Sequence, residues 1–135
     1  MFEEKTTSLG EYFENVESVG ILSTADAEGN VDSAIYARPH VVDGDTVAFI
    51  MGDHLSHSNV ESNPHAAYLF LEQGQGKGTA GYNGLRRYLT KTGEETDPRK
   101  IDAVRRKERK GEDLGGTKKY LVRFKVDEAR RLVGD

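Results

Sequence analysis

The chain has 135 residues, 19 basic and 23 acidic side chains, and a formal net charge of −4 at neutral pH. This length predicts a single domain over residues 1–135, and the mildly acidic balance does not favour nucleic-acid binding. Because there is no cysteine, disulfide scaffolds, thiol nucleophiles, cysteine zinc sites and iron–sulfur clusters are excluded. Hydrophobic residues make up only 36% of the chain, so we expect a small core or one completed by a second subunit.

The sequence gives no signal for membrane binding or export. No apolar run approaches the roughly 20 residues that a membrane-spanning helix needs. The first residues, Met1 to Lys5, are acidic and lack the basic start and apolar centre of a signal peptide. We therefore expect a cytoplasmic protein that does not bind a membrane.

The first half of the chain predicts one helix and then three extended segments. Ser8 and Glu11 form a capping box that begins an amphipathic helix over residues 8–17. Strands are predicted at residues 19–24, 31–42 and 46–51. Pro39 should bend the second strand, and the dipeptide Asp43-Gly44 predicts a hairpin before the third.

The second half alternates short helices with strands. Ser56 is the expected N-cap of a helix that ends at Asn63-Pro64, because a residue before proline avoids the helical conformation. Asp97-Pro98 begins another helix. Strands are predicted at residues 66–71, 85–91 and 119–126, separated by a glycine-rich stretch at 73–84 and a loop at 111–116. In the last strand, Tyr120, Val122, Phe124 and Val126 share one face.

These elements predict a mainly β protein of the α+β type. Six short strands with hairpin signals favour a closed or half-closed antiparallel barrel with small flanking helices, because closure protects strand edges. Long helices do not alternate with the strands, so a doubly wound α/β fold is disfavoured.

Three patterns with possible chemistry have simpler interpretations. Residues 76–81 fit G-x-G-x-x-G, but poor helix formers follow, so we interpret them as a flexible hairpin loop. His54 and His57 have metal-ligand spacing beside Asp53, but no third ligand is evident; we interpret them as surface residues and predict no metal site. Residues 105–110 are mostly basic and suggest a solvated helix face, with an anion or nucleic-acid patch as the alternative. Residues 107–118 are expected to be mobile.

The start of the helix near Ser56 is a candidate phosphate site. Free backbone N–H groups and the positive end of the helix dipole meet there, and Ser56 and His57 add side-chain donors. Arg38, on the neighbouring hairpin strand, could supply a cation, although a surface charge is an equal alternative.

Residues 35–39 (Ile-Tyr-Ala-Arg-Pro), 47–51 (Val-Ala-Phe-Ile-Met) and 55–70, in this order, resemble the pyridoxamine 5′-phosphate oxidase-like FMN-binding split barrels. The likeness is closest to the small general-stress and FMN-binding-protein members, and it covers about residues 8–135. It implies a six-stranded split barrel that forms a homodimer, with FMN in each of two interface clefts. It also implies a flavin-dependent oxidoreductase whose substrate is not evident from the sequence.

The resemblance also implies which residues contact the cofactor. They are Tyr36, Ala37, Arg38 and Pro39 beside the flavin ring, Ile50, Met51 and Gly52 at a strand end, Ser56, His57 and Asn59 on the helix, and Arg86 and Arg87 from the partner subunit. Ser56 stands where many relatives have a phosphate-binding lysine, so His57, Arg38 or the Arg86-Arg87 pair must supply the charge.

The sequence is also compatible with other functions. The sequence contains no tryptophan and lacks the substrate segment of true pyridoxamine phosphate oxidases, so vitamin oxidation is not predicted. No catalytic residue is assigned. The alternatives are a non-catalytic FMN carrier for electron transfer and a haem-binding split-barrel protein.

Overall fold

The computed structural model describes residues 18–73, 82–105, 110–111 and 117–134. Two helices and seven strands lie in this part of the chain. The helices are α2 (Leu55–Ser62) and α3 (Pro98–Val104). The strands are β1 (Ser18–Ala25), β2 (Val31–Ile35), β3 (His40–Val41), β4 (Thr46–Gly52), β5 (His65–Gln73), β6 (Tyr82–Glu95) and β7 (Lys119–Arg131).

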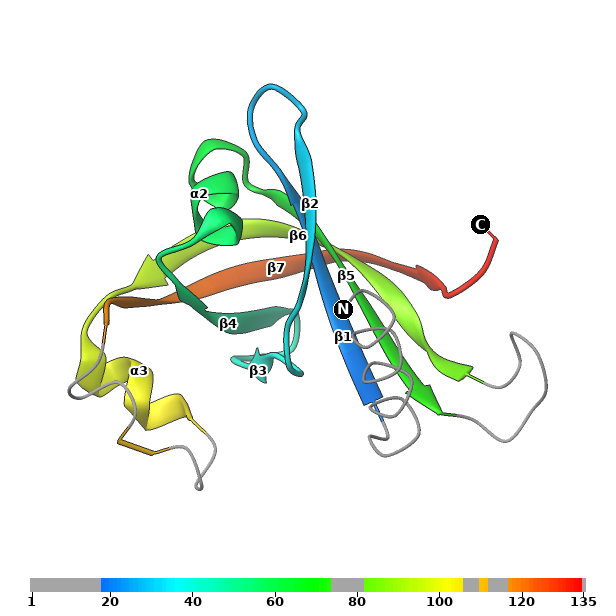
Figure 1. Ribbon diagram of the computed structural model, residues 1–135. Helices are drawn as coiled ribbons and strands as arrows, with labels where there is room; N and C mark the ends of the chain where they lie inside the picture. The colour runs from blue at the N-terminus through cyan, green and yellow to red at the C-terminus, as the bar shows by residue number, and fades with distance from the viewer. Residues whose placement is uncertain (1–17, 74–81, 106–109, 112–116, 135) are drawn as a thin grey trace, which may run out of the picture.

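All seven strands belong to one antiparallel sheet in the order β2-β1-β5-β6-β7-β4-β3. The long strands β6 and β7 cross the molecule and carry β5 and β1 on one side and β4 and β3 on the other (Figure 1). The two outer strands, β2 and β3, follow one another in the chain. This is the mainly β split barrel that the sequence predicted.

The strand count is seven rather than the predicted six, because the segment 31–42 divides into β2 and β3. The backbone N–H of Tyr36 still donates to the carbonyl of Gly20 on β1, at 3.0 Å. Beyond it the chain leaves β1, and Pro39 has no N–H with which to continue a ladder. Pairing resumes where His40 meets Ala48 of β4.

The helix boundaries confirm two predicted signals and correct one. Asn63, the residue before Pro64, ends α2 in an extended conformation as expected. Asp97 caps α3 through a bond from the backbone N–H of Arg99. The N-cap of α2 is His54, not Ser56, because β4 runs on to Gly52 and the helix begins at Leu55. Ser56 therefore lies inside the first turn, with a buried side chain.

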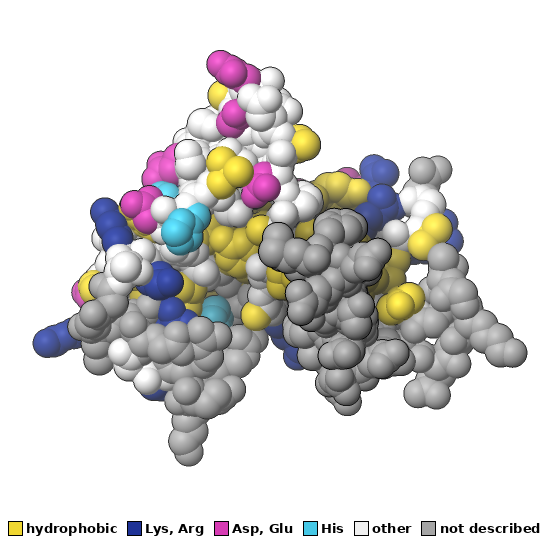
Figure 2. All heavy atoms as spheres, in the orientation of Figure 1, with side chains coloured by type: hydrophobic (Ala, Val, Ile, Leu, Met, Phe, Trp, Pro, Cys, Tyr) yellow, Lys and Arg dark blue, Asp and Glu magenta, His cyan; other side chains and the backbone are white. Residues whose placement is uncertain are grey.

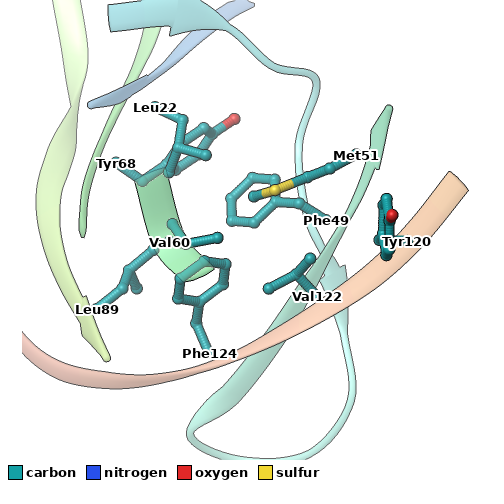
Figure 3. Packing of buried hydrophobic residues seen from close by; sticks show 9 residues of the cluster. All are labelled: Leu22, Phe49, Met51, Val60, Tyr68, Leu89, Tyr120, Val122 and Phe124. Carbon is teal, nitrogen blue, oxygen red and sulfur yellow. The ribbon is translucent and has the colours of Figure 1, made fainter. Parts of the chain in front are cut away.

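The core fills the inside of the curled sheet (Figure 3). Side chains from β1, β4, β5, β6 and β7 converge there and surround Val60, which α2 contributes. The cluster consists of Leu22, Phe49, Met51, Val60, Tyr68, Leu89, Tyr120, Val122 and Phe124. The predicted inward face of the last strand is confirmed, since Tyr120, Val122 and Phe124 are all buried.

A second, smaller cluster lies on the opposite face of β4 and β7. It consists of Ala48, Ile101 and Leu121, with Ile50 packed against it. Ile101 is the only buried residue of α3, so this helix covers the sheet through one side chain. Both faces of β4 are therefore buried near α3.

Several sequence expectations lie outside the described residues. They are the helix at 8–17, the glycine pattern at 76–81, most of the loop at 111–116 and most of the basic run at 105–110. Of the segment 107–118, only residues 110, 111, 117 and 118 are described. Within the described residues, no helix has the length and apolar character to cross a membrane.

We predict that Gly20→Ala destabilises the fold. A Cβ at this position would lie 1.9 Å from the Tyr68 hydroxyl and 2.5 Å from the Tyr36 carbonyl, the two groups that hydrogen-bond to each other. Overpacking of this kind costs about 1–3 kcal/mol of unfolding free energy, measurable by urea denaturation. Gly44→Ala is the matched control, because a Cβ there meets nothing within 4 Å. Equal stability of the two variants would contradict this packing.

Candidate functional site

A cavity of about 320 Å³ opens on the inner face of the sheet. Most of the described residues in its walls are apolar or aromatic, and the charged groups among them are two arginines and one glutamate. It is lined by Arg38, Pro39, Val41, Val47, Phe49, Tyr68, Phe70, Glu72, Arg87 and Leu89. The lining therefore combines the connection between β2 and β3 with side chains of β3, β4, β5 and β6.

Arg38 lies at the exposed side of this cavity. Its guanidinium carbon is 5.2 Å from the centre of the Phe70 ring, a cation–π distance. Its Nη2 atom is 3.9 Å from a carboxylate oxygen of Glu72, and both side chains are more than half exposed. An ion pair so exposed contributes little to stability, so its two charges add to the character of the cavity mouth more than to the stability of the fold.

The sheet separates the two neighbouring arginines of β6. Arg87 pairs across the ladder with Tyr68 and lines the cavity. Arg86 pairs with Leu69 and lies on the other face, because successive strand residues point to opposite sides. There its guanidinium donates to the carbonyls of Arg131 and Gly134. Arg86 holds the end of β7 and does not line the cavity.

Tyr36 connects the cavity wall to α2. Its ring meets Phe49 edge-on at 5.8 Å, and its carbonyl accepts a hydrogen bond from the Tyr68 hydroxyl at 3.0 Å. Burial raises the pKa of the Tyr36 hydroxyl, and a hydrogen bond with Ser56 opposes that shift. Tyr36 therefore contacts two aromatic residues of the cavity lining, Phe49 and Tyr68, without lining the cavity itself.

The remaining predicted contacts are dispersed. Met51 is fully buried in the core, whereas Ile50 packs on the outer face. Gly52 lies beneath the His54 ring, where a Cβ would be 2.8 Å from the ring. Asn59 is buried and donates to Thr24 Oγ1 at 3.0 Å. Ala37 is exposed between Tyr36 and Arg38.

His57 has a different environment from the surface position expected of it. It is buried, and its ring stacks on Tyr120 with centroids 3.6 Å apart. Its Nε2 atom lies 3.0 Å from Glu94 Oε1 and 3.2 Å from Glu61 Oε1. The surface interpretation holds for His54, which is exposed, and is wrong for His57.

Lys91 completes this group, which we call the His57 cluster (His57, Glu61, Lys91 and Glu94). Its ammonium lies 2.9 Å from Glu94 Oε1 and 4.0 Å from Glu61 Oε2. Partial burial alone would raise the pKa of Glu94, but hydrogen bonds from Lys91 and His57 outweigh it and lower that pKa. The cluster attaches α2 to the end of β6.

The sequence reasoning did not single out Glu72, Glu61, Lys91 or Glu94; the family resemblance implied only that residues 70–73 of the partner subunit lie near the cofactor. Glu72 continues the alternation of Tyr68 and Phe70, so a strand extended by one residue would have placed it on the inner face. The four-residue spacing of His57 and Glu61 places both on one side of a helix. Lys91 and Glu94 gave no local signal, because the predicted strand ended at residue 91 and β6 continues to Glu95.

Known structures share this fold. An FMN-binding protein from Syntrophomonas wolfei matches with a TM-score of 0.68 and 15% identity, over 86% of this chain and 78% of that one. HutZ, the haem storage protein of Vibrio cholerae, matches with a TM-score of 0.64 and 16% identity, over 90% and 89%. A Clostridium acetobutylicum protein related to general stress protein 26, of the pyridoxinephosphate oxidase family, matches with a TM-score of 0.60 and 13% identity, over 97% and 92%.

No family model matches the sequence, and no curated protein does. At these identities the structural matches establish the fold and not the activity or cofactor. The chain has the pyridoxamine 5′-phosphate oxidase-like split-barrel fold.

We predict that Glu94→Gln lowers stability at neutral pH by about 1 kcal/mol, because it weakens the hydrogen bonds with His57 and Lys91. The folded state lowers the pKa of Glu94 below its usual 4.5. Its stabilisation is therefore complete above that pH and is lost as the pH falls through the lower, folded-state value. Urea denaturation of the unmodified chain and of Glu94→Gln, from neutral pH to acid and in a buffer that contains a metal chelator, measures the difference in unfolding free energy. A gap that persists in acid would contradict this assignment.

Proposed function

We propose that this chain binds FMN in the cavity and acts as a flavin-dependent oxidoreductase. The observation that carries the proposal is the combination of aromatic walls with Arg38 and Arg87 around one opening. The volume of about 320 Å³ falls within the usual range for small-molecule sites, about 300–1,000 Å³. The fold supports the choice, since a protein that shares it is described as FMN-binding.

The donor chemistry of the cavity suits a flat ring with an anionic tail. Guanidinium groups match phosphate oxygens with paired hydrogen bonds, so Arg38 and Arg87 would hold the phosphate. Phe70, which is partly exposed, would offer apolar surface to the flavin ring, whereas Phe49 is 2% exposed and belongs to the core. FMN would supply hydride or electron transfer when bound. The chain itself would bind and orient the ring and exclude water from it.

Other residues that the sequence predicted would act indirectly, by positioning the residues that line the cavity. Tyr36 contacts Phe49 and Tyr68 and forms a hydrogen bond with Ser56. Met51 lies in the same core cluster as Phe49. These side chains would fix the positions of the aromatic walls, and Ala37 and Pro39 would set the path that brings Arg38 to the opening.

We also propose a homodimer. Large hydrophobic side chains are exposed on the two outer strands and next to them: Val31, Ile35, Val41 and Val42. Figure 2 shows hydrophobic side chains at the surface below the acidic tip of the β1–β2 hairpin. Two copies related by a twofold axis would cover such surfaces mutually. The dimer would also complete a core that the 36% hydrophobic content leaves small.

Haem is the second candidate cofactor, because HutZ, a haem storage protein, shares the fold. The usual proximal haem ligand is histidine. No histidine is among the described residues that line the cavity, which favours flavin. The absorption spectrum of the purified protein, with mass identification of the released cofactor, separates the two.

We predict that Arg38→Ala weakens FMN binding by about 1.5–3 kcal/mol, the contribution of a hydrogen bond to a charged group. Riboflavin, which lacks the phosphate, should be barely affected. Arg87→Ala should behave in the same way, and Glu72→Gln should tighten FMN because it removes a negative charge 3.9 Å from Arg38. Flavin fluorescence titration measures all three.

Arg86→Ala is the matched control, because Arg86 lies on the opposite face of β6. It should leave FMN affinity unchanged. If Arg86→Ala weakens FMN and Arg38→Ala does not, the phosphate does not bind in the cavity. Equal losses of FMN and riboflavin in Arg38→Ala would also contradict the assignment.

We predict that the exposed edge residues contribute to the dimer. Val41 and Ile35 are 77% and 58% exposed, so Val41→Asp combined with Ile35→Asp should leave the monomer folded and weaken self-association. Sedimentation equilibrium gives the association constant, and circular dichroism checks the fold. A stable monomer of the unmodified chain at micromolar concentration would refute the dimer.

A further inference from the structure

The His57 cluster lies apart from the cavity. None of its four residues lines that cavity, and in Figure 1 α2 and β3 lie on opposite sides of β4. Nothing in the proposed flavin chemistry uses these groups. The cluster therefore needs an explanation of its own.

Three groups of this cluster present metal-binding atoms to one point. The Nε2 atom of His57 and one carboxylate oxygen each from Glu61 and Glu94 lie within 4.8 Å of one another. The two distances from Nε2, 3.0 Å and 3.2 Å, are close to a ligand–ligand edge of about 3.3–3.5 Å. That edge follows from a tetrahedron with zinc–ligand bonds of about 2.0–2.1 Å.

His57 is held in position by the surrounding protein and not by an ion. Only 5% of the His57 side chain is exposed, and its ring is stacked on Tyr120. His57 and Glu61 come from one side of α2, and Glu94 comes from β6. Glu61 is half exposed, which leaves one side of the cluster open to solvent. Three protein ligands with one open side are typical of zinc sites that retain a water.

Lys91 shows that the two carboxylates attract a cation. Its ammonium lies 2.9 Å from Glu94 and 4.0 Å from Glu61, and it is the group that balances their charge beside His57. A divalent ion bound by Glu94 would repel that ammonium, so Lys91 would have to turn towards solvent. Lys91 is thus a competitor for the site, and removing its charge should strengthen metal binding.

We propose that His57, Glu61 and Glu94 form a Zn²⁺ site that joins α2 to β6. Imidazole together with carboxylates suits Zn²⁺ better than Mg²⁺, which prefers oxygen ligands and several waters. The site does not depend on the proposed flavin function.

The test is titration of the untagged, metal-free full chain with ZnCl₂, by calorimetry and by competition with a chromophoric chelator. We expect one Zn²⁺ per chain and no comparable binding of Mg²⁺. Glu61→Gln and His57→Gln should each weaken Zn²⁺ by at least about tenfold, the loss that even an outer partner of a ligand causes. Lys91→Met should tighten it.

His54→Gln is the matched control, because His54 is an exposed histidine at the start of the same helix and makes no side-chain capping bond. It should leave Zn²⁺ affinity unchanged. Glu61→Gln keeps the test decisive if His57→Gln fails to fold, since Glu61 is half exposed. Absence of saturable Zn²⁺ binding, or an affinity that Glu61→Gln leaves unchanged, would overturn the proposal. So would an equal loss in His54→Gln.

Discussion

The ring of Phe49 is the point at which separate segments of the barrel meet. It contacts Tyr36 from the connection after β2, Tyr68 from β5 and Phe124 from β7, with centroid distances of 5.8, 4.9 and 5.9 Å. Aromatic rings in tilted or edge-on contact gain energy beyond the area that they bury. These contacts join β4 and the segment after β2, which lie near opposite ends of the sheet order, to the more central strands β5 and β7. The curl of the sheet therefore depends on them.

The same packing determines where the cavity lies. Phe49 and Tyr68 belong to the core and also form part of the cavity wall. The side chain of Val60 enters the core from α2 (Figure 3), so this helix fills part of the space that the sheet encloses. The space that remains is bounded by Arg38, Phe70 and Glu72 on its exposed side. Charged groups are therefore tolerated there, because water still reaches them.

Local sequence patterns predicted most of the strands because burial follows the strand period. Alternation in residues 119–126 and the hairpin before residue 46 required no knowledge of distant contacts. The proline before His40 indicated a bend, but the division into β2 and β3 depends on where Tyr36 stops pairing with Gly20. His57 was misplaced for a similar reason, since its burial depends on Tyr120 and Glu94, which are far away in the sequence.

The two charged regions of the molecule differ in the kind of ligand that they suit. Around His57, two carboxylates face one ammonium and an imidazole, so a phosphate near those side chains would meet like charge. Among the described residues that line the cavity, two guanidinium groups accompany the single carboxylate of Glu72. Charge alone therefore directs an anion towards Arg38 and Arg87 and a cation towards Glu61 and Glu94. A helix dipole contributes only about half a unit charge at its start, which is too little to reverse that order.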